Sequence, residues 1–260
     1  MPPRPRSAGR SRPKRSFWRV LLRGTELILF FGVVTGGAYA LYDYARTSER
    51  LRVKTIAISG AAVIDERDII AETGITNVDN LLFLDIDAIQ EQVQDMPYVK
   101  HCRVERDFPD RVVVTVVERT AVATLVVDSR LYLIDKDGVV LRELTPHEAP
   151  YGPLITQVQG IGYVSLGSRL DHKSLEAALA VWDGFSSTRM AQDVVVSEIA
   201  APHEDHIRMY CDELPFEIRW GRNDFVNEAY RLDLIWEKTN HDPPCSEYLD
   251  LRFGDQPVCK

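Results

Sequence analysis

The residues best suited to chemistry lie in the run His203-Glu204-Asp205-His206. Two imidazoles three residues apart, with carboxylates between them, could form part of a metal site or an acid–base pair. However, Pro202 precedes the run and all four residues are polar, which favours a hairpin loop between two strands. We therefore expect a polar loop here and no metal site.

A second candidate is the run Asp135-Lys136-Asp137-Gly138, which is similar to the start of a calcium-binding loop. Such a loop needs a glycine at its sixth position and a glutamate at its twelfth, and the sequence lacks both. A hairpin turn is the simpler interpretation. The chain also contains no nucleophile elbow, Walker loop or dinucleotide fingerprint. We therefore expect a protein that is not an enzyme, with no cofactor and no small-molecule substrate.

The elements that would carry such residues begin with an uncharged run of sixteen residues from Leu27 to Tyr42. A helix of that length rises about 24 Å, and the apolar residues and tyrosines that flank it extend it toward a bilayer core of about 30 Å. We expect a single membrane-spanning helix over residues 27–45, with the lipid bilayer as its partner. A cleaved signal peptide is the alternative, because Ala38-Tyr39-Ala40 resembles a cleavage site.

The tail ahead of the span, residues 1–26, is rich in Lys, Arg, Pro and Ser and is expected to be disordered. Because basic residues beside a span stay in the cytoplasm, the tail predicts a cytoplasmic N-terminus and an external body. The whole chain has a net charge of −8 in spite of this basic tail. The body is therefore strongly acidic, which argues against nucleic acid as a ligand.

The body reads as α+β from its patterns of apolar residues. Asp65 and Asp85 are expected to cap two short helices, and alternation predicts three strands over residues 53–59, 99–106 and 111–118. The order β-α-α-β-β suits a small domain over residues 50–119 with helices covering one face of its sheet.

Residues 120–260 predict a second, mainly antiparallel β-domain that also contains helices. One helix is expected around residues 175–182, between Asp171 and Gly184, and another around residues 225–236, capped by Asn223. Strands are expected over residues 120–127, 131–134, 139–143, 194–199, 207–212 and 216–220, with a final strand over residues 248–253.

The four cysteines divide into two pairs by position. Cys102 and Cys211 share strand parity with apolar neighbours, so we expect small core residues. Cys245 and Cys259 bracket the final strand. Their spacing leaves open both a disulfide and two free thiols.

Three runs of the body carry motifs in a fixed order. The first extends from Met96-Pro97-Tyr98-Val99 through Phe108-Pro109 to Glu118-Arg119, the second is the strand–turn–strand over residues 131–140, and the third is Tyr248-Leu249-Asp250-Leu251-Arg252-Phe253. Together they resemble the FtsQ/DivIB family of bacterial cell-division proteins. The resemblance implies a POTRA domain, an FtsQ-type β-domain, and a scaffold of the divisome in the inner membrane that is essential for septum formation.

The resemblance also implies a partner site. In the family, the C-terminal strand region of the β-domain docks the division partners FtsB and FtsL. Carried over by position, and completed with the outward residues of the strand, the partner-binding residues are Tyr248, Asp250, Arg252, Phe253 and Gly254.

Alternation along this last strand predicts Leu249, Leu251 and Phe253 facing inward and the intervening residues facing outward. We expect the strand to be a sheet edge that accepts a strand from its partner. A terminal strand already paired on both sides is the alternative.

Two other functional classes remain open at this stage. A POTRA-bearing assembly or secretion component of the outer membrane would carry a barrel of many alternating strands. A membrane-tethered hydrolase would depend on His203 and His206.

Overall fold

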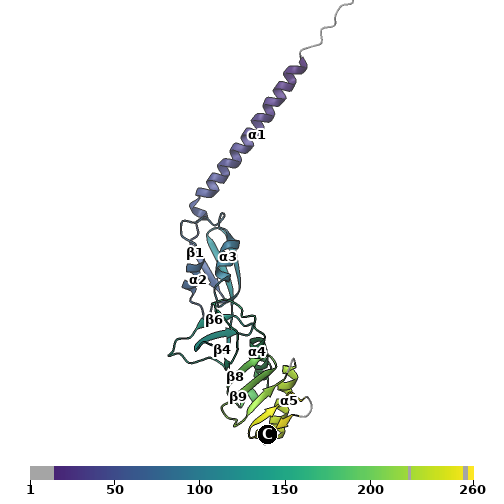
Figure 1. Cartoon of the computed structure of the whole chain (residues 1–260). Coiled ribbons are helices and arrows are strands. Elements are labelled where there is room, and N and C mark those ends of the chain that lie inside the picture. The colour runs from purple at the N-terminus through teal and green to yellow at the C-terminus, as the bar shows by residue number, and fades with distance from the viewer. Residues whose placement is uncertain (1–14, 222–223, 254–256) are drawn as a thin grey trace, which may run out of the picture. The chain divides into compact units, whose positions relative to one another are not determined.

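The computed structural model describes residues 15–221, 224–253 and 257–260, with side chains from residue 28 onward (Figure 1). The sites predicted at Asn223 and Gly254, and most of the predicted tail, fall outside these residues. The described chain divides into two compact units. One unit contains the N-terminal residues to Thr55 together with Ile75–Leu84 and Arg106–Val112, and the other contains the remainder.

The first helix, α1, extends over Arg15–Thr47. Its residues 28–47 are long and apolar enough to cross a membrane. The predicted span over residues 27–45 falls inside this helix, which also continues upstream. A short 3₁₀ helix, η1 (Glu49–Leu51), follows it.

The next elements have the predicted β-α-α-β-β order. Asp65 and Asp85 cap their helices as expected, since each carboxylate accepts a hydrogen bond from a backbone amide of the first turn. The three strands form a sheet in the order β1-β3-β2. The elements are β1 (Thr55–Ser59), α2 (Glu66–Glu72), α3 (Ile86–Gln94), β2 (Val99–Asp107) and β3 (Arg111–Glu118).

The Glu-Arg pair that ends β3 has two structural tasks. The Glu118 carboxylate accepts hydrogen bonds from the amides of Val63 and Ile64 and so fixes the turn before α2. Arg119 Nη1 lies 2.7 Å from Asp135 Oδ2. The other oxygen of Asp135 accepts from the amide of Val139, which makes the Asp135-Gly138 run a hairpin turn, as expected.

Among the described residues, the larger sheet has nine strands in the order β12-β11-β10-β9-β8-β7-β4-β5-β6. Most neighbouring pairs are antiparallel, but β4 with β7, β7 with β8 and β10 with β11 are parallel. The strands are β4 (Ala121–Val127), β5 (Arg130–Asp135), β6 (Val140–Glu143), β7 (Leu154–Thr156), β8 (Val196–His203), β9 (His206–Cys211), β10 (Glu217–Trp220), β11 (Tyr248–Asp250) and β12 (Val258–Cys259). The sequence did not predict β7 or β12, because two or three residues are too few to show alternation.

Two helices, α4 (Lys173–Ser186) and α5 (Phe225–Lys238), pack against each other, and α4 also packs on β8 and β9 (Figure 1). Their apolar stripes join the inward residues of the strands in one core. Gly184 was expected to end α4 but lies within it. A Cβ there would meet Phe225 O at 3.2 Å, so this glycine permits the close approach of α5.

Candidate functional site

The last strands of the sheet differ from the predicted open edge. Strand β11 is only three residues long and is paired on both flanks, in parallel with β10 and antiparallel to β12. Strand β12 runs antiparallel to β11, so that Leu249 pairs with Cys259 and Asp250 with Val258. The prediction that β11 offers a free edge is therefore wrong. The edge strand is β12.

Strand β12 is fixed to the segment before β11 by a disulfide and by main-chain hydrogen bonds. Cys245 and Cys259 are joined, with their Cα atoms 5.2 Å apart, which settles the alternative left open by the sequence. Lys260 O accepts from the amides of Ser246, Glu247 and Tyr248, and Lys260 N donates to Tyr248 O. The edge is short but firmly held.

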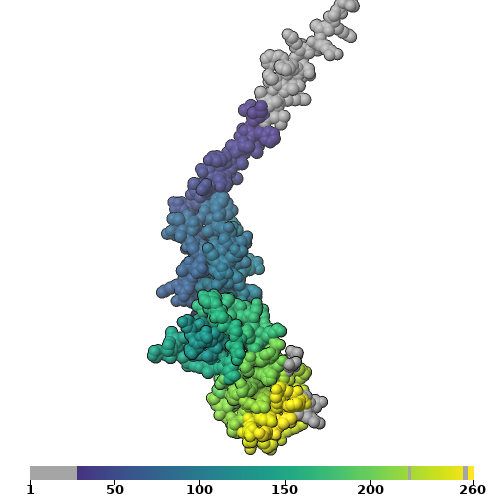
Figure 2. All heavy atoms as spheres, in the orientation of Figure 1, coloured from purple at the N-terminus to yellow at the C-terminus, as the bar shows by residue number. Residues whose placement is uncertain are grey.

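The outer side of β12 carries the main-chain groups that a partner could reach. Because Lys260 exchanges hydrogen bonds with Tyr248, alternation directs the N–H and C=O of Cys259 away from β11. Pro257 has no N–H to donate. Residues 257–260 are exposed, and they lie at the surface of the yellow end of the molecule in Figure 2.

The predicted site residues are only partly available. Asp250 was expected to face outward but is 2% exposed, and the Arg252 side chain returns onto its carboxylate. Its carboxylate accepts from Arg252 Nε at 2.9 Å and from Arg252 Nη2 at 2.6 Å. Burial raises the pKa of Asp250, but the Arg252 hydrogen bonds outweigh it and the pKa lies below its usual value. Asp250 thus serves to position Arg252.

The two aromatic residues of the predicted site behave differently from each other. Phe253 was expected to face inward but is 60% exposed, since the strand ends at Asp250 and alternation no longer applies. Tyr248 is half-buried, and the guanidinium of Arg219 lies 3.9 Å from the centre of its ring. Leu249 and Leu251 are buried as predicted.

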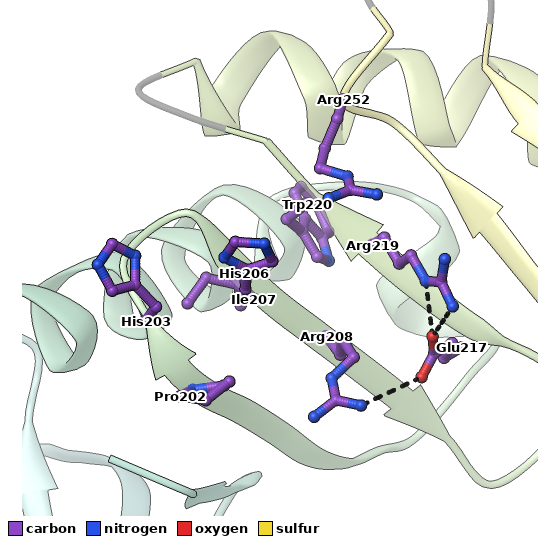
Figure 3. Close-up of a pocket in the computed structure, with 9 residues that line it drawn as sticks. All are labelled: Pro202, His203, His206, Ile207, Arg208, Glu217, Arg219, Trp220 and Arg252. Atoms are coloured by element: carbon purple, nitrogen blue, oxygen red, sulfur yellow. Dashed lines mark hydrogen bonds and ion pairs between the residues drawn. The ribbon is translucent and has the colours of Figure 1, made fainter. Parts of the chain in front are cut away.

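A hollow of about 400 Å³ lies over β8, β9 and β10 of the same sheet, and β11 separates these strands from the edge strand β12 (Figure 3). Three arginines from different elements meet there, Arg208 from β9, Arg219 from β10 and Arg252 from the segment after β11. Alternation along β9 and β10 would have shown that Arg208 and Arg219 face outward. It would not have shown that β10 is the neighbour of β11. The complete lining is Pro202, His203, His206, Ile207, Arg208, Glu217, Arg219, Trp220 and Arg252.

The hollow has excess positive charge. Glu217 is its one carboxylate, with Oε1 2.6 Å from Arg219 Nη2 and Oε2 4.0 Å from Arg208 Nη1. The fully buried indole of Trp220 also lines the hollow, and its Nε1 has no hydrogen-bond partner among the residues described. Guanidinium groups are donors only, so the three arginines of this lining suit a carboxylate or carbonyl oxygen.

The predicted loop at His203 and His206 is the hairpin between β8 and β9, and its two imidazole rings lie 6.0 Å apart. Within the described ranges, no group of three or more His, Cys, Asp or Glu side chains is arranged to hold a metal ion.

The fold and the site together define a class of protein. In this class an apolar N-terminal helix suited to membrane anchoring precedes a β-α-α-β-β domain and a second domain built on a large mixed β-sheet. Residues 51–119 match the family described as POTRA domain, FtsQ-type. Residues 123–252 match the family described as Cell division protein FtsQ/DivIB, C-terminal. The chain belongs to the FtsQ/DivIB family of cell division proteins.

Individual relatives agree with this assignment. The chain is 30% identical to the cell division protein FtsQ of Myxococcus fulvus over 81% of its own length and 73% of the relative's. It is 24% identical to FtsQ of Syntrophotalea carbinolica over 94% of its length and 87% of the relative's. It is 33% identical to FtsQ of Caulobacter vibrioides over 66% of its length and 59% of the relative's. Membership of this family favours a role in cell division over the two other classes considered.

Proposed function

We propose that this protein is a single-pass scaffold of the division machinery, with its N-terminus in the cytoplasm and its body in the periplasm at the septum. It recruits membrane proteins of the FtsB and FtsL type through the end of the β-domain. The observation that carries the proposal is the exposed edge of β12 together with the arginine-lined hollow on the same sheet, one strand further in.

The edge and the hollow suit a partner segment that contributes both a strand and an acidic side chain. Main-chain hydrogen bonds to Cys259 would align the added strand, and side-chain contacts beside it would supply specificity. The exposed ring of Phe253, next in sequence to Arg252 of the hollow, offers an apolar contact. Aromatic anchors next to charged groups are typical of the residues that dominate interface energies.

Electrostatics supports the same class of partner. The body as a whole is acidic, whereas three of the four ionised residues in the hollow are arginines. Such a local reversal of sign favours an acidic segment at this position over the remaining surface. Anchoring of both proteins in one membrane raises their effective concentration, so a modest intrinsic affinity suffices.

The proposal is tested by co-purification of the full-length protein with candidate partners, using the variant Arg208→Glu with Phe253→Ala. Arg208 is preferred to Arg252 because loss of Arg252 would leave the buried Asp250 carboxylate unpaired and weaken the fold. We expect capture to fall about tenfold or more, equivalent to about 1.4 kcal/mol.

A matched control replaces an exposed arginine and an exposed aromatic residue elsewhere in the β-domain. The change Arg130→Glu with Tyr163→Ala fits, because the Arg130 side chain is 65% exposed and Tyr163 is 87% exposed. Capture by the control should equal that of the unmodified protein. Equal capture by both double variants would contradict the placement of the site.

A further inference from the structure

The loop before α3, residues 76–84, is joined to the end of the apolar helix α1 by contacts within one compact unit of the chain. Asn80 Nδ2 donates to the carbonyl oxygens of Ala45 at 2.8 Å and Arg46 at 3.1 Å. These carbonyls lie in the last turn of α1, where helix carbonyls have no partner within the helix. The loop therefore caps the helix end with a side-chain amide.

Main-chain pairing strengthens this connection. Residues 51–53, just after α1, run antiparallel to residues 79–81. Leu81 N donates to Leu51 O at 2.7 Å, and Val53 N donates to Asp79 O at 2.9 Å. Leu81 itself is fully buried. The position of the loop along the helix axis is thus fixed by the backbone as well as by Asn80.

The ring of Phe83 contacts the ring of Tyr42, with centroids 5.4 Å apart and planes at 79°. Tyr42 is five residues before the end of α1, which places it about 7.5 Å back along the axis. Phe83 therefore lies beside the helix, at the level of tyrosines that mark a membrane interface.

Two adjacent residues of this fixed loop expose large apolar side chains, since Leu82 and Phe83 are each 44% exposed. Several backbone groups around them have partners within the protein. Arg106 donates to the carbonyls of Leu81 and Leu84, and Phe83 N donates to Asn80 O. Such internal hydrogen bonds lower the cost of bringing this loop into a medium poor in water.

We propose that Leu82 and Phe83 insert into the surface of the bilayer that α1 spans, at the membrane–water interface on the side of the body. This loop is then a lipid-contacting surface beside the span. The occupant is the bilayer that holds α1, because Asn80 and Tyr42 fix the loop to the end of that helix. The charged residues nearest to it, Asp43, Arg46 and Asp79, would then face the headgroup layer, and Glu49 would lie in the water beyond that layer. The inference rests on the proposed anchoring by α1.

The test uses the full-length protein at one copy per lipid nanodisc, with a fluorescent label on an introduced cysteine and nitroxide-bearing lipids as quenchers. Leu82→Cys reports on the loop. Val33→Cys, at a 73% exposed position of α1, reports on anchoring. Glu49→Cys, in η1 just beyond the helix, is the matched control, because this side chain is 83% exposed. The native thiols of Cys102 and Cys211 are buried and should remain unlabelled.

We expect strong loss of fluorescence at positions 82 and 33 and little loss at position 49. If fluorescence is lost at position 33 but is retained at position 82 as it is at position 49, the inference is overturned and the anchoring by α1 stands. No loss at position 33 would overturn both. Protection of position 82 only after a second membrane protein is added would assign the loop to a protein partner and overturn the lipid contact.

Discussion

The disulfide between Cys245 and Cys259 predicts a redox dependence confined to the end of the sheet. The two cysteines are 14 residues apart. On the loop-entropy model, a cross-link that closes a loop of this size raises the free energy of the detached segment by about 3 kcal/mol. Without the bond, β12 would be held by its short ladder on β11, by the main-chain hydrogen bonds of Lys260 and by the ion pair of Lys260 with Glu247. Detachment of β12 should then become up to about a hundredfold more frequent.

Amide hydrogen exchange can measure this change at two neighbouring residues of the same segment. The amide of Tyr248 donates to Lys260 O, on the β12 side. The amide of Leu251 donates to Arg219 O, on the β10 side. Reduction, or the change Cys245→Ser, should accelerate exchange at Tyr248 and leave Leu251 unchanged. The buried Cys211, replaced by Ser, provides a control that leaves the disulfide in place.

Two results would refute this reasoning. Unchanged exchange at Tyr248 after reduction would mean that main-chain pairing alone holds β12. Equal acceleration at both amides would mean that the disulfide stabilises the whole domain. If the expected difference is found, the partner-capture assay should also respond, because reduction would remove the edge that the partner is proposed to extend.

Three further predictions concern stability. Asp250→Asn should lower the free energy of unfolding at pH 7 by about 2 kcal/mol through loss of the charge-assisted bonds to Arg252. Because the pKa of Asp250 is lowered in the folded state, its contribution to stability is present above pH about 4 and is lost as the pH falls through the folded-state pKa. The free energies of unfolding of the parent and the variant, measured by urea titration across that range, should therefore converge in acid. Burial raises the pKa of Glu228, so its contribution to stability is most favourable below pH about 4 and declines as the pH rises through the folded-state pKa. The variant Glu228→Gln should lack that decline and be at least as stable as the parent at pH 7 in the same urea titrations. A variant that is less stable than the parent at pH 7 would contradict this prediction. Gly60→Ala should cost about 3 kcal/mol or more in thermal unfolding, since Gly60 has φ of +88° and a Cβ would lie 2.1 Å from Val116 O; an unchanged melting temperature would show that the turn can shift.

Local chemistry was readable from the sequence wherever a few neighbouring residues are enough to decide a structure. The carboxylates of Asp65 and Asp85 cap the helices that follow them, because a cap needs only an acceptor and the next amides. Alternation placed Leu249 and Leu251 inside, and a long apolar run gave the helix α1. The order of motifs along the chain gave the family.

The site itself depends on contacts between distant segments, which no local pattern encodes. Two residues of β12, next to a proline, give no periodic signal, yet they cover β11 and move the edge of the sheet outward by one strand. The exposure of Phe253 likewise follows from the early end of β11 at Asp250.

The hollow shows the same division most clearly. The sequence determined that Arg208 and Arg219 face the uncovered side of their strands, because side chains alternate along a strand. Only the tertiary structure decided that β9, β10 and β11 are neighbours, and so brought Arg252 beside them. Strand order is a property of chain topology and of the shared core, and it brings Arg252 beside Arg219 and Arg208, which are 33 and 44 positions earlier in the sequence.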